Sequence, residues 1–244
     1  MSGAVRTRRL GTAVLALGLL AMSFETCADA LPQDLGSLSL EDLGKVVVSS
    51  VSKKPQPLSD ASAAVYVISH DDIMRSGATD LPGMLRLAPN LSVFQSSPSG
   101  YIVTARGFSG NNDAQNFPNK LLVLIDGRSV YSPIFSGMYW DDQFVLPQNI
   151  ERIEVISGPG GALWGANAVN GVINIITRQA GDTQGGMLWL SAGTREHGEA
   201  VQYGGALGQH AHYRVYARDF RRRSFDNSAG QDAHDGWSNP QIGF

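Results

Sequence analysis

The feature that most constrains this chain is an apolar run near its N-terminus, with none of comparable length after it. Residues 10–24 carry no charge and follow three arginines between positions 6 and 9. Ala28 and Ala30 then place small residues at the two positions that a signal peptidase recognises before its cleavage site. A spanning helix needs about 20 apolar residues, so we expect residues 1–30 to be a cleaved export signal. An exported chain without a later apolar helix is periplasmic, secreted or a β-barrel.

Composition and charge exclude several classes of function. The chain has 244 residues, 43% of them hydrophobic, which is enough for one well-buried domain and part of another. A net charge of -3 gives a nucleic-acid partner no electrostatic support. The single cysteine, Cys27, lies inside the expected signal, so the mature chain would have no disulfide or thiolate metal site. We expect no cofactor, no metal site and no enzymatic activity.

Between residues 58 and 180, short β-prone stretches alternate with turn signals. Ser69 and Asp72 have the spacing of a helix cap, and Gly77 follows where that helix would end. A second helix is expected from Thr79-Asp80, with Pro82 in its first turn, and it should include Leu87 and end before Pro89. We expect strands at residues 64–68, 101–106, 121–125, 150–156 and 172–177.

Two glycine-containing sequences in this region could be mistaken for a catalytic or a nucleotide-binding motif. Asp126-Gly127 separates two β-prone runs and is typical of a hairpin turn, not of a catalytic acid. The run Gly158–Gly161 has neither the Lys-Ser/Thr pair nor the glycine spacing of a nucleotide-binding loop. The pattern therefore indicates structural turns at both places.

The pattern changes after Gly181, where three longer stretches alternate apolar and polar residues. They span residues 187–192, 199–207 and 212–220, and a fourth begins near the end of the chain. This alternation, with its aromatic share, suits transmembrane barrel strands. A soluble half-buried sheet alternates in the same way, so the pattern alone leaves both open.

The segment before the first domain, residues 31–57, is expected to be flexible. Its β-prone stretch, residues 45–51, is followed by two lysines and two prolines. Such a stretch suits pairing with the sheet edge of another chain, or it is an ordinary edge strand.

Three stretches together resemble the plug domain of TonB-dependent outer-membrane receptors. They are IVTARGF at residues 102–108, LVLIDG at 122–127 and IERIEVISGPGGALWGANAVNGVINIIT at 150–177. The resemblance covers about residues 49–178. It implies an α+β plug, a small mixed sheet with short helices, followed by the first antiparallel strands of an incomplete transmembrane β-barrel. The implied domains are a signal peptide at 1–30, a flexible segment at 31–57, the plug at 58–180 and the first barrel strands at 181–244.

The resemblance also implies a function in transport. Such receptors take up a scarce ligand, for example a ferric siderophore, haem or cobalamin, across the cell outer membrane. The implied partners are the C-terminal domain of TonB in the energy-coupling complex, outer-membrane lipid, and a small-molecule or metal-chelate ligand. A barrel of 22 strands needs about 10 residues for each strand, so we expect this chain to be an N-terminal fragment of a receptor. The alternative is a stand-alone periplasmic plug-like module that binds ligand without transport.

Three sets of site residues follow from the resemblance. The candidate TonB box consists of Val46, Val47, Val48, Ser49 and Ser50. The charges expected to contact the barrel wall, or else to form a solvated strand edge, are Arg106, Glu151, Arg152 and Glu154. The aromatic residues expected to stack on a ligand, or to pack against the barrel wall, are Tyr131, Tyr139 and Trp140.

Overall fold

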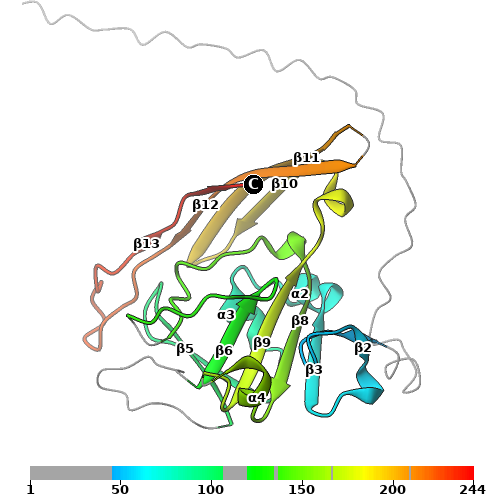
Figure 1. Ribbon diagram of the computed structural model, residues 1–244. Helices are drawn as coiled ribbons and strands as arrows, with labels where there is room; N and C mark the ends of the chain where they lie inside the picture. Colours follow the sequence, from blue (N-terminus) through cyan, green and yellow to red (C-terminus); the bar gives the residue numbers. More distant parts are fainter. Residues whose placement is uncertain (1–45, 107–119, 135–136, 166, 209) are drawn as a thin grey trace, which may run out of the picture. The chain divides into compact units, whose positions relative to one another are not determined.

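The computed structural model describes residues 46–106, 120–134, 137–165, 167–208 and 210–244 (Figure 1). The expected export signal lies outside the described residues. Among the described residues, no helix has both the length and the apolar character needed to cross a membrane.

The central sheet is mixed and has the order β3-β8-β9-β6-β7 (Figure 1). Its strands are β3 (Ala64–Ser69), β8 (Ile150–Ser157), β9 (Gly171–Thr177), β6 (Leu121–Ile125) and β7 (Arg128–Ser129). Strands β6 and β9 are parallel, and the other neighbours are antiparallel. The first four residues of β6 are buried. This confirms the prediction, made from its continuous apolar run, that the strand is covered on both faces.

The hairpin between β6 and β7 turns at Asp126 and Gly127. Both have positive φ, 50° and 75°, as in a two-residue type I′ turn. The Asp126 carboxylate accepts hydrogen bonds from the Thr177 backbone N–H at 2.8 Å and from its hydroxyl at 2.9 Å. Asp126 therefore fixes the turn to the end of β9. The predicted hairpin turn at Asp126-Gly127 is confirmed.

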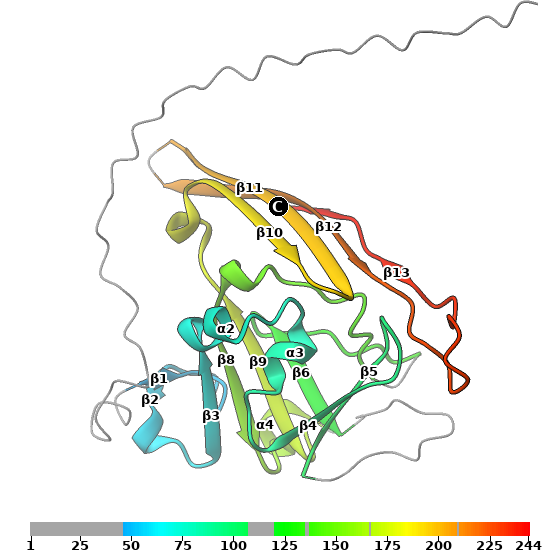
Figure 2. The same ribbon diagram turned by 180° about the vertical axis from the view of Figure 1, so that it is seen from behind.

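Two short helices lie against the sheet (Figure 2). Helix α2 (His70–Ser76) has the predicted capping box of Ser69 and Asp72 and ends at left-handed Gly77. Helix α3 (Leu81–Leu85) begins at Asp80, whose side chain accepts from the Gly83 N–H at 2.7 Å. It is shorter than the sequence pattern predicts. The backbone after Leu85 bonds to carbonyls three residues back, which tightens the chain into turns.

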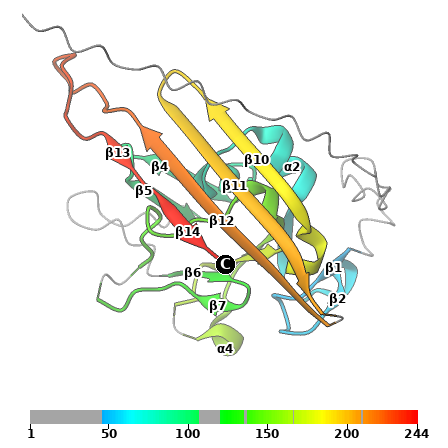
Figure 3. The same cartoon turned by 90° about the horizontal axis from the view of Figure 1, so that it is seen from above.

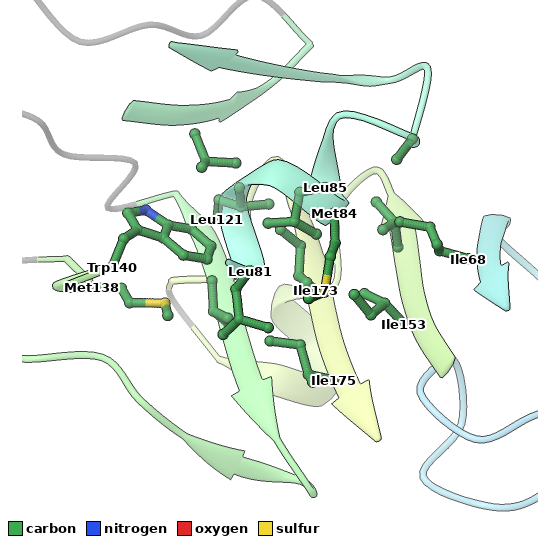
Figure 4. Close-up of a cluster of buried hydrophobic side chains, with 14 of the residues drawn as sticks. Ile68, Leu81, Met84, Leu85, Leu121, Met138, Trp140, Ile153, Ile173 and Ile175 are labelled. Atoms are coloured by element: carbon green, nitrogen blue, oxygen red, sulfur yellow. The ribbon is translucent and has the colours of Figure 1, made fainter. Parts of the chain in front are cut away.

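The main core lies between the helices and one face of the central sheet. Figure 4 shows Leu81, Met84 and Leu85 of α3 against isoleucines of β8 and β9. A second, smaller cluster on the sheet includes Leu122 and Val172, with Trp164 packed against it. Burying each large aliphatic side chain contributes about 1.5–3 kcal/mol, so the two clusters together stabilise the domain.

Two further pairs of strands complete the domain. Strands β4 (Leu91–Gln95) and β5 (Tyr101–Ala105) form an antiparallel hairpin. Only β5 was predicted, because β4 has mixed burial and no continuous apolar run. Strands β1 (Val47–Val48) and β2 (Gln56–Pro57) pair near the N-terminal end, and the one-turn helix α4 (Gly161–Trp164) follows β8.

The C-terminal strands form a separate antiparallel sheet (Figure 3). Its strands are β10 (Gly185–Ala192), β11 (Glu196–Leu207), β12 (Ala211–Arg222), β13 (Trp237–Ser238) and β14 (Gln241–Gly243). On β11, Val201 and Tyr203 are exposed, whereas Ala200 and Gln202 are buried. The predicted alternation of faces is therefore present, and the exposed face is the apolar one.

Candidate functional site

The candidate TonB box lies in a short hairpin. Val47 pairs with Pro57 and Val48 with Gln56, and the Leu58 N–H donates to the Val46 carbonyl at 2.8 Å. Val48 is fully buried, whereas Val47 is 50% exposed. The structure thus places this segment against the rest of the domain, with one side turned outward.

The next two residues of the segment are bound by a buried carboxylate. The backbone N–H groups of Ser49 and Ser50 donate to Glu154 at 3.1 and 2.9 Å. Glu154 is fully buried on β8, and the Arg152 guanidinium also donates to it at 2.9 Å. A buried carboxylate without such donors would be costly, so these three bonds make its position tenable.

Ser50 is also held by its other polar atoms. Its hydroxyl accepts from the Asn174 side chain at 2.9 Å, and its carbonyl accepts from the Trp164 indole N–H at 2.8 Å. Ser50 itself is 1% exposed. Two sets of residues that the sequence analysis treated separately, the candidate TonB box and the charges of β8, therefore contact each other.

The four charges expected to face a barrel wall occupy different environments. Arg106 is exposed and has a positive φ of 58° directly after β5. Glu151 is exposed and pairs with Arg152, which also pairs with Glu154. A solvated strand edge describes Glu151 but not Glu154, because Glu154 is fully buried. Contact of these charges with a barrel wall stays a prediction.

A different ion-pair cluster joins the domain to the C-terminal sheet. Arg222 on β12 pairs with Asp80 at 2.9 Å and with Glu196, its cross-strand neighbour on β11, at 2.7 Å. Its guanidinium also donates to the Pro98 carbonyl at 2.8 Å and to the Tyr101 hydroxyl at 2.9 Å. This cluster was not predicted from the sequence, because its members are far apart in the chain.

Tyr101 and Thr79 extend the same cluster. The Tyr101 hydroxyl donates to Asp80 at 2.6 Å, and the Thr79 hydroxyl donates to Glu196 at 2.6 Å. Burial, followed by the negative charge of Asp80, raises the pKa of Tyr101 above its usual value. Tyr101 therefore stays protonated and acts as a hydrogen-bond donor.

Strand β12 carries an arginine at every fourth position, and these residues share its less exposed face: Arg214, Arg218 and Arg222. Arg214 donates to the Arg178 carbonyl at 3.1 Å. Arg218 is buried and lies 3.0 Å from the ring centroid of Phe144, and its nitrogens meet no acceptor within the described part of the chain. The signal in the sequence is the repeat of arginine on one strand face.

The aromatic candidates for ligand contact separate by burial. Trp140 is 5% exposed and belongs to the main core, beside Met138 (Figure 4). Tyr139 is 41% exposed and Tyr131 is half-buried. The structure therefore places Trp140 inside the domain, and the two tyrosines retain surface that a ligand could reach.

Within the ranges that the structure describes, no group of three or more histidine, cysteine, aspartate or glutamate side chains is placed to hold a metal ion.

The α+β domain contacts the long antiparallel strands through polar and charged groups. This arrangement defines a class of protein. The strands bury polar residues on the domain side and expose apolar residues on the other, as in a barrel with a plugged lumen. The family described as the TonB-dependent receptor plug domain matches residues 57–172. The chain thus carries the plug domain and first strands of a TonB-dependent outer-membrane receptor, and its place is the cell outer membrane.

Two curated relatives match over longer stretches. The vitamin B12 transporter BtuB of Vibrio vulnificus is 35% identical over 157 residues, which cover 63% of this chain and 24% of the relative. The ferric enterobactin receptor of Pseudomonas aeruginosa is 30% identical over 218 residues, which cover 82% of this chain and 28% of the relative. The chain spans about a quarter of the length of these relatives. Their names describe a transporter and a receptor, which agrees with the expectation that the protein is not an enzyme.

A solved structure shows the same fold. FpvA of P. aeruginosa, in a complex with iron and a heterologous pyoverdine, superposes with a TM-score of 0.59 at 20% identity. The match covers 74% of this chain and 23% of the other. At this identity the likeness concerns the fold alone.

Proposed function

We propose that the full-length protein takes up a scarce metal chelate across the outer membrane by TonB-dependent transport. The observation that carries this proposal is the plug domain bound to strands that are apolar on their other face. Leu188 and Leu190 on β10 and Val201 on β11 are more than half exposed on that face. Outer-membrane lipid is the partner that suits such a surface.

The ligand class comes from the relatives. One is named for vitamin B12 and another for ferric enterobactin. Both compounds are bulky metal chelates, so we propose a ferric siderophore, haem or cobalamin as the ligand of this protein. Tyr131 and Tyr139 are the candidates for contact, because aromatic rings bury large area and Tyr adds a polar group.

Energy coupling is proposed to act through residues 46–50. TonB would pair with this segment by strand addition, in which main-chain hydrogen bonds supply affinity. The half-exposed Val47 supports this assignment, because it leaves one side of the segment open. Arg106 and Glu151, which are exposed in the described chain, are proposed to meet charges on the barrel wall.

The test is uptake in a receptor-deficient Gram-negative host that expresses the full-length protein, with and without TonB. Labelled ferric enterobactin, haem and cobalamin are supplied in turn. We expect one of them to bind the cell surface in both hosts but to enter only when TonB is present. Equal entry in both hosts would contradict TonB dependence. Binding at the cell surface, or binding by the purified protein, without entry in either host would instead support a binding module without transport.

A further inference from the structure

Arg218 is a buried cation that forms no ion pair with the residues that the structure describes. It is 5% exposed, and its three guanidinium nitrogens have no hydrogen-bond acceptor in that part of the chain. Arg222, on the same face of β12, pairs with both Asp80 and Glu196. Because an unpaired buried charge costs several kcal/mol, Arg218 calls for a negative group of its own.

A second unpartnered donor borders the same small cavity. Trp140 packs in the main core (Figure 4), is 5% exposed, and its indole nitrogen has no acceptor among the described residues. Arg218 and Trp140 both line a cavity of about 20 Å³, together with Phe144 and Phe220. Buried donors without a partner are rare in native proteins. Two of them at one cavity indicate a bound group that accepts hydrogen bonds.

The size and the lining of the cavity restrict this group. About 10–15 Å³ admits one water-sized sphere, so the cavity holds a single occupant of that size. A water molecule would also need acceptors for its own protons. Both oxygens of Asp80 already accept hydrogen bonds, and the Asp141 carbonyl accepts from Asn239. A halide ion only accepts, so it suits this lining better than water.

We propose that the cavity beside Arg218 and Trp140 binds one monovalent anion of the size of chloride. The guanidinium supplies the charge and charge-assisted hydrogen bonds, and the indole N–H supplies a neutral donor. Phe144 packs on the guanidinium, whose carbon lies 3.0 Å from the ring centroid, and holds it by cation–π attraction. The anion neutralises Arg218 where β12 meets the plug. This site does not depend on which ligand the receptor transports.

The first measurement locates the anion. The purified full-length protein is crystallised with sodium bromide in place of sodium chloride, and diffraction is recorded at the bromine absorption edge. We expect an anomalous peak within hydrogen-bonding distance of the Arg218 guanidinium and the Trp140 indole nitrogen. Density without an anomalous signal would mean water and overturns the proposal. A carboxylate found against Arg218 overturns it too, including that of Asp141, which also lines the cavity.

The second measurement follows binding in solution. Thermal unfolding of the full-length protein is recorded in sodium chloride and in sodium gluconate at equal ionic strength, because gluconate is too large for the cavity. The midpoint should rise with chloride and then saturate, as expected for a ligand of the native state. Arg218→Gln should abolish this dependence. Trp140→Phe keeps a ring in the core and removes one donor, so half of the effect should need about tenfold more chloride.

The matched control is Arg221→Gln, three residues away on the opposite face of β12. The Arg221 side chain is 59% exposed and pairs with Asp219. This variant should keep the chloride dependence of the parent protein. A dependence that is unchanged in both Arg218→Gln and Trp140→Phe, or that is lost equally in the control, overturns the proposal. Trp140→Phe retains the buried charge and keeps the test decisive if Arg218→Gln does not fold.

Discussion

At the scale of residues, one buried guanidinium joins four parts of the chain. Arg222 binds the cap of α3 through Asp80, the start of β11 through Glu196, the Pro98 carbonyl and the Tyr101 hydroxyl. Its ion-pair partners lie on both sides of the boundary between the plug domain and the C-terminal sheet. Arg222 therefore fixes where that sheet meets the plug.

Arg222→Ala should loosen this region strongly. Asp80 and Glu196 would lose the cation they share; because their side chains are 18% and 27% exposed, the cost should be less than the about 3–5 kcal/mol of a fully buried pair. Hydrogen–deuterium exchange is expected to speed up in α3 and β5. Arg221→Ala is the control, because Arg221 is 59% exposed and pairs only with Asp219 among the described residues. Equal exchange rates in the two variants would show that Arg222 does not fix where the C-terminal sheet meets the plug.

The local residue signals were readable from the sequence, and the long-range ones were not. The capping box of Ser69 and the turn at Asp126 depend on neighbours within three residues, so spacing alone predicted them. Glu154 was predicted to face a barrel wall or solvent. Its burial depends on Ser49 and Ser50, which lie more than 100 residues earlier. Nothing in the local pattern of β8 indicates that contact.

At the scale of elements, strands β3, β6 and β9 of the central sheet were predictable because each is a short, mostly apolar run between turn residues, and β8 was predictable from its alternating pattern. Strand β4 was missed, since Leu91–Gln95 is not a continuous apolar run and depends on pairing with β5. Helix α3 was predicted too long, because Leu87 continues the apolar pattern after the helical bonds end. Strand pairing and helix termination thus depend on contacts that the hydrophobic periodicity of the sequence does not reveal.

Close packing within the central sheet gives a test of the strand arrangement. Gly171 begins β9 between β8 and β6, and an added Cβ would lie 2.4 Å from the Ile156 carbonyl oxygen. Gly171→Ala should therefore lower the free energy of unfolding by about 1–3 kcal/mol, as overpacking does. Gly186→Ala in β10 is the control, because nothing lies within 4 Å of its added Cβ. Chemical denaturation measures both, and equal stability of the two variants would argue against this packing.

At the scale of the whole molecule, the exposed apolar face of the C-terminal sheet is the surface that should meet lipid. Val201 lies on this face in the middle of β11 and is 54% exposed. Val201→Arg should reduce the amount of full-length protein in the outer membrane, because arginine on a lipid-facing strand costs about 2–4 kcal/mol near the bilayer centre.

The control for this prediction is His210→Arg, at the exposed turn between β11 and β12. That variant should assemble normally, because a turn residue does not enter the hydrocarbon. The readout is the folded receptor in isolated outer membranes. Normal assembly of Val201→Arg would mean that this face does not contact lipid.

Energy coupling through residues 46–50 is the central proposal for this protein, and Val47→Pro tests it directly in the full-length protein. Proline has no N–H and fixes φ, so it should prevent strand addition by TonB. Val47→Ile keeps β-propensity and serves as the control. Uptake and surface binding of the labelled ligand are measured on the same cells. We expect Val47→Pro to abolish uptake and keep binding, whereas Val47→Ile should keep both. Normal uptake by Val47→Pro would contradict energy coupling through residues 46–50.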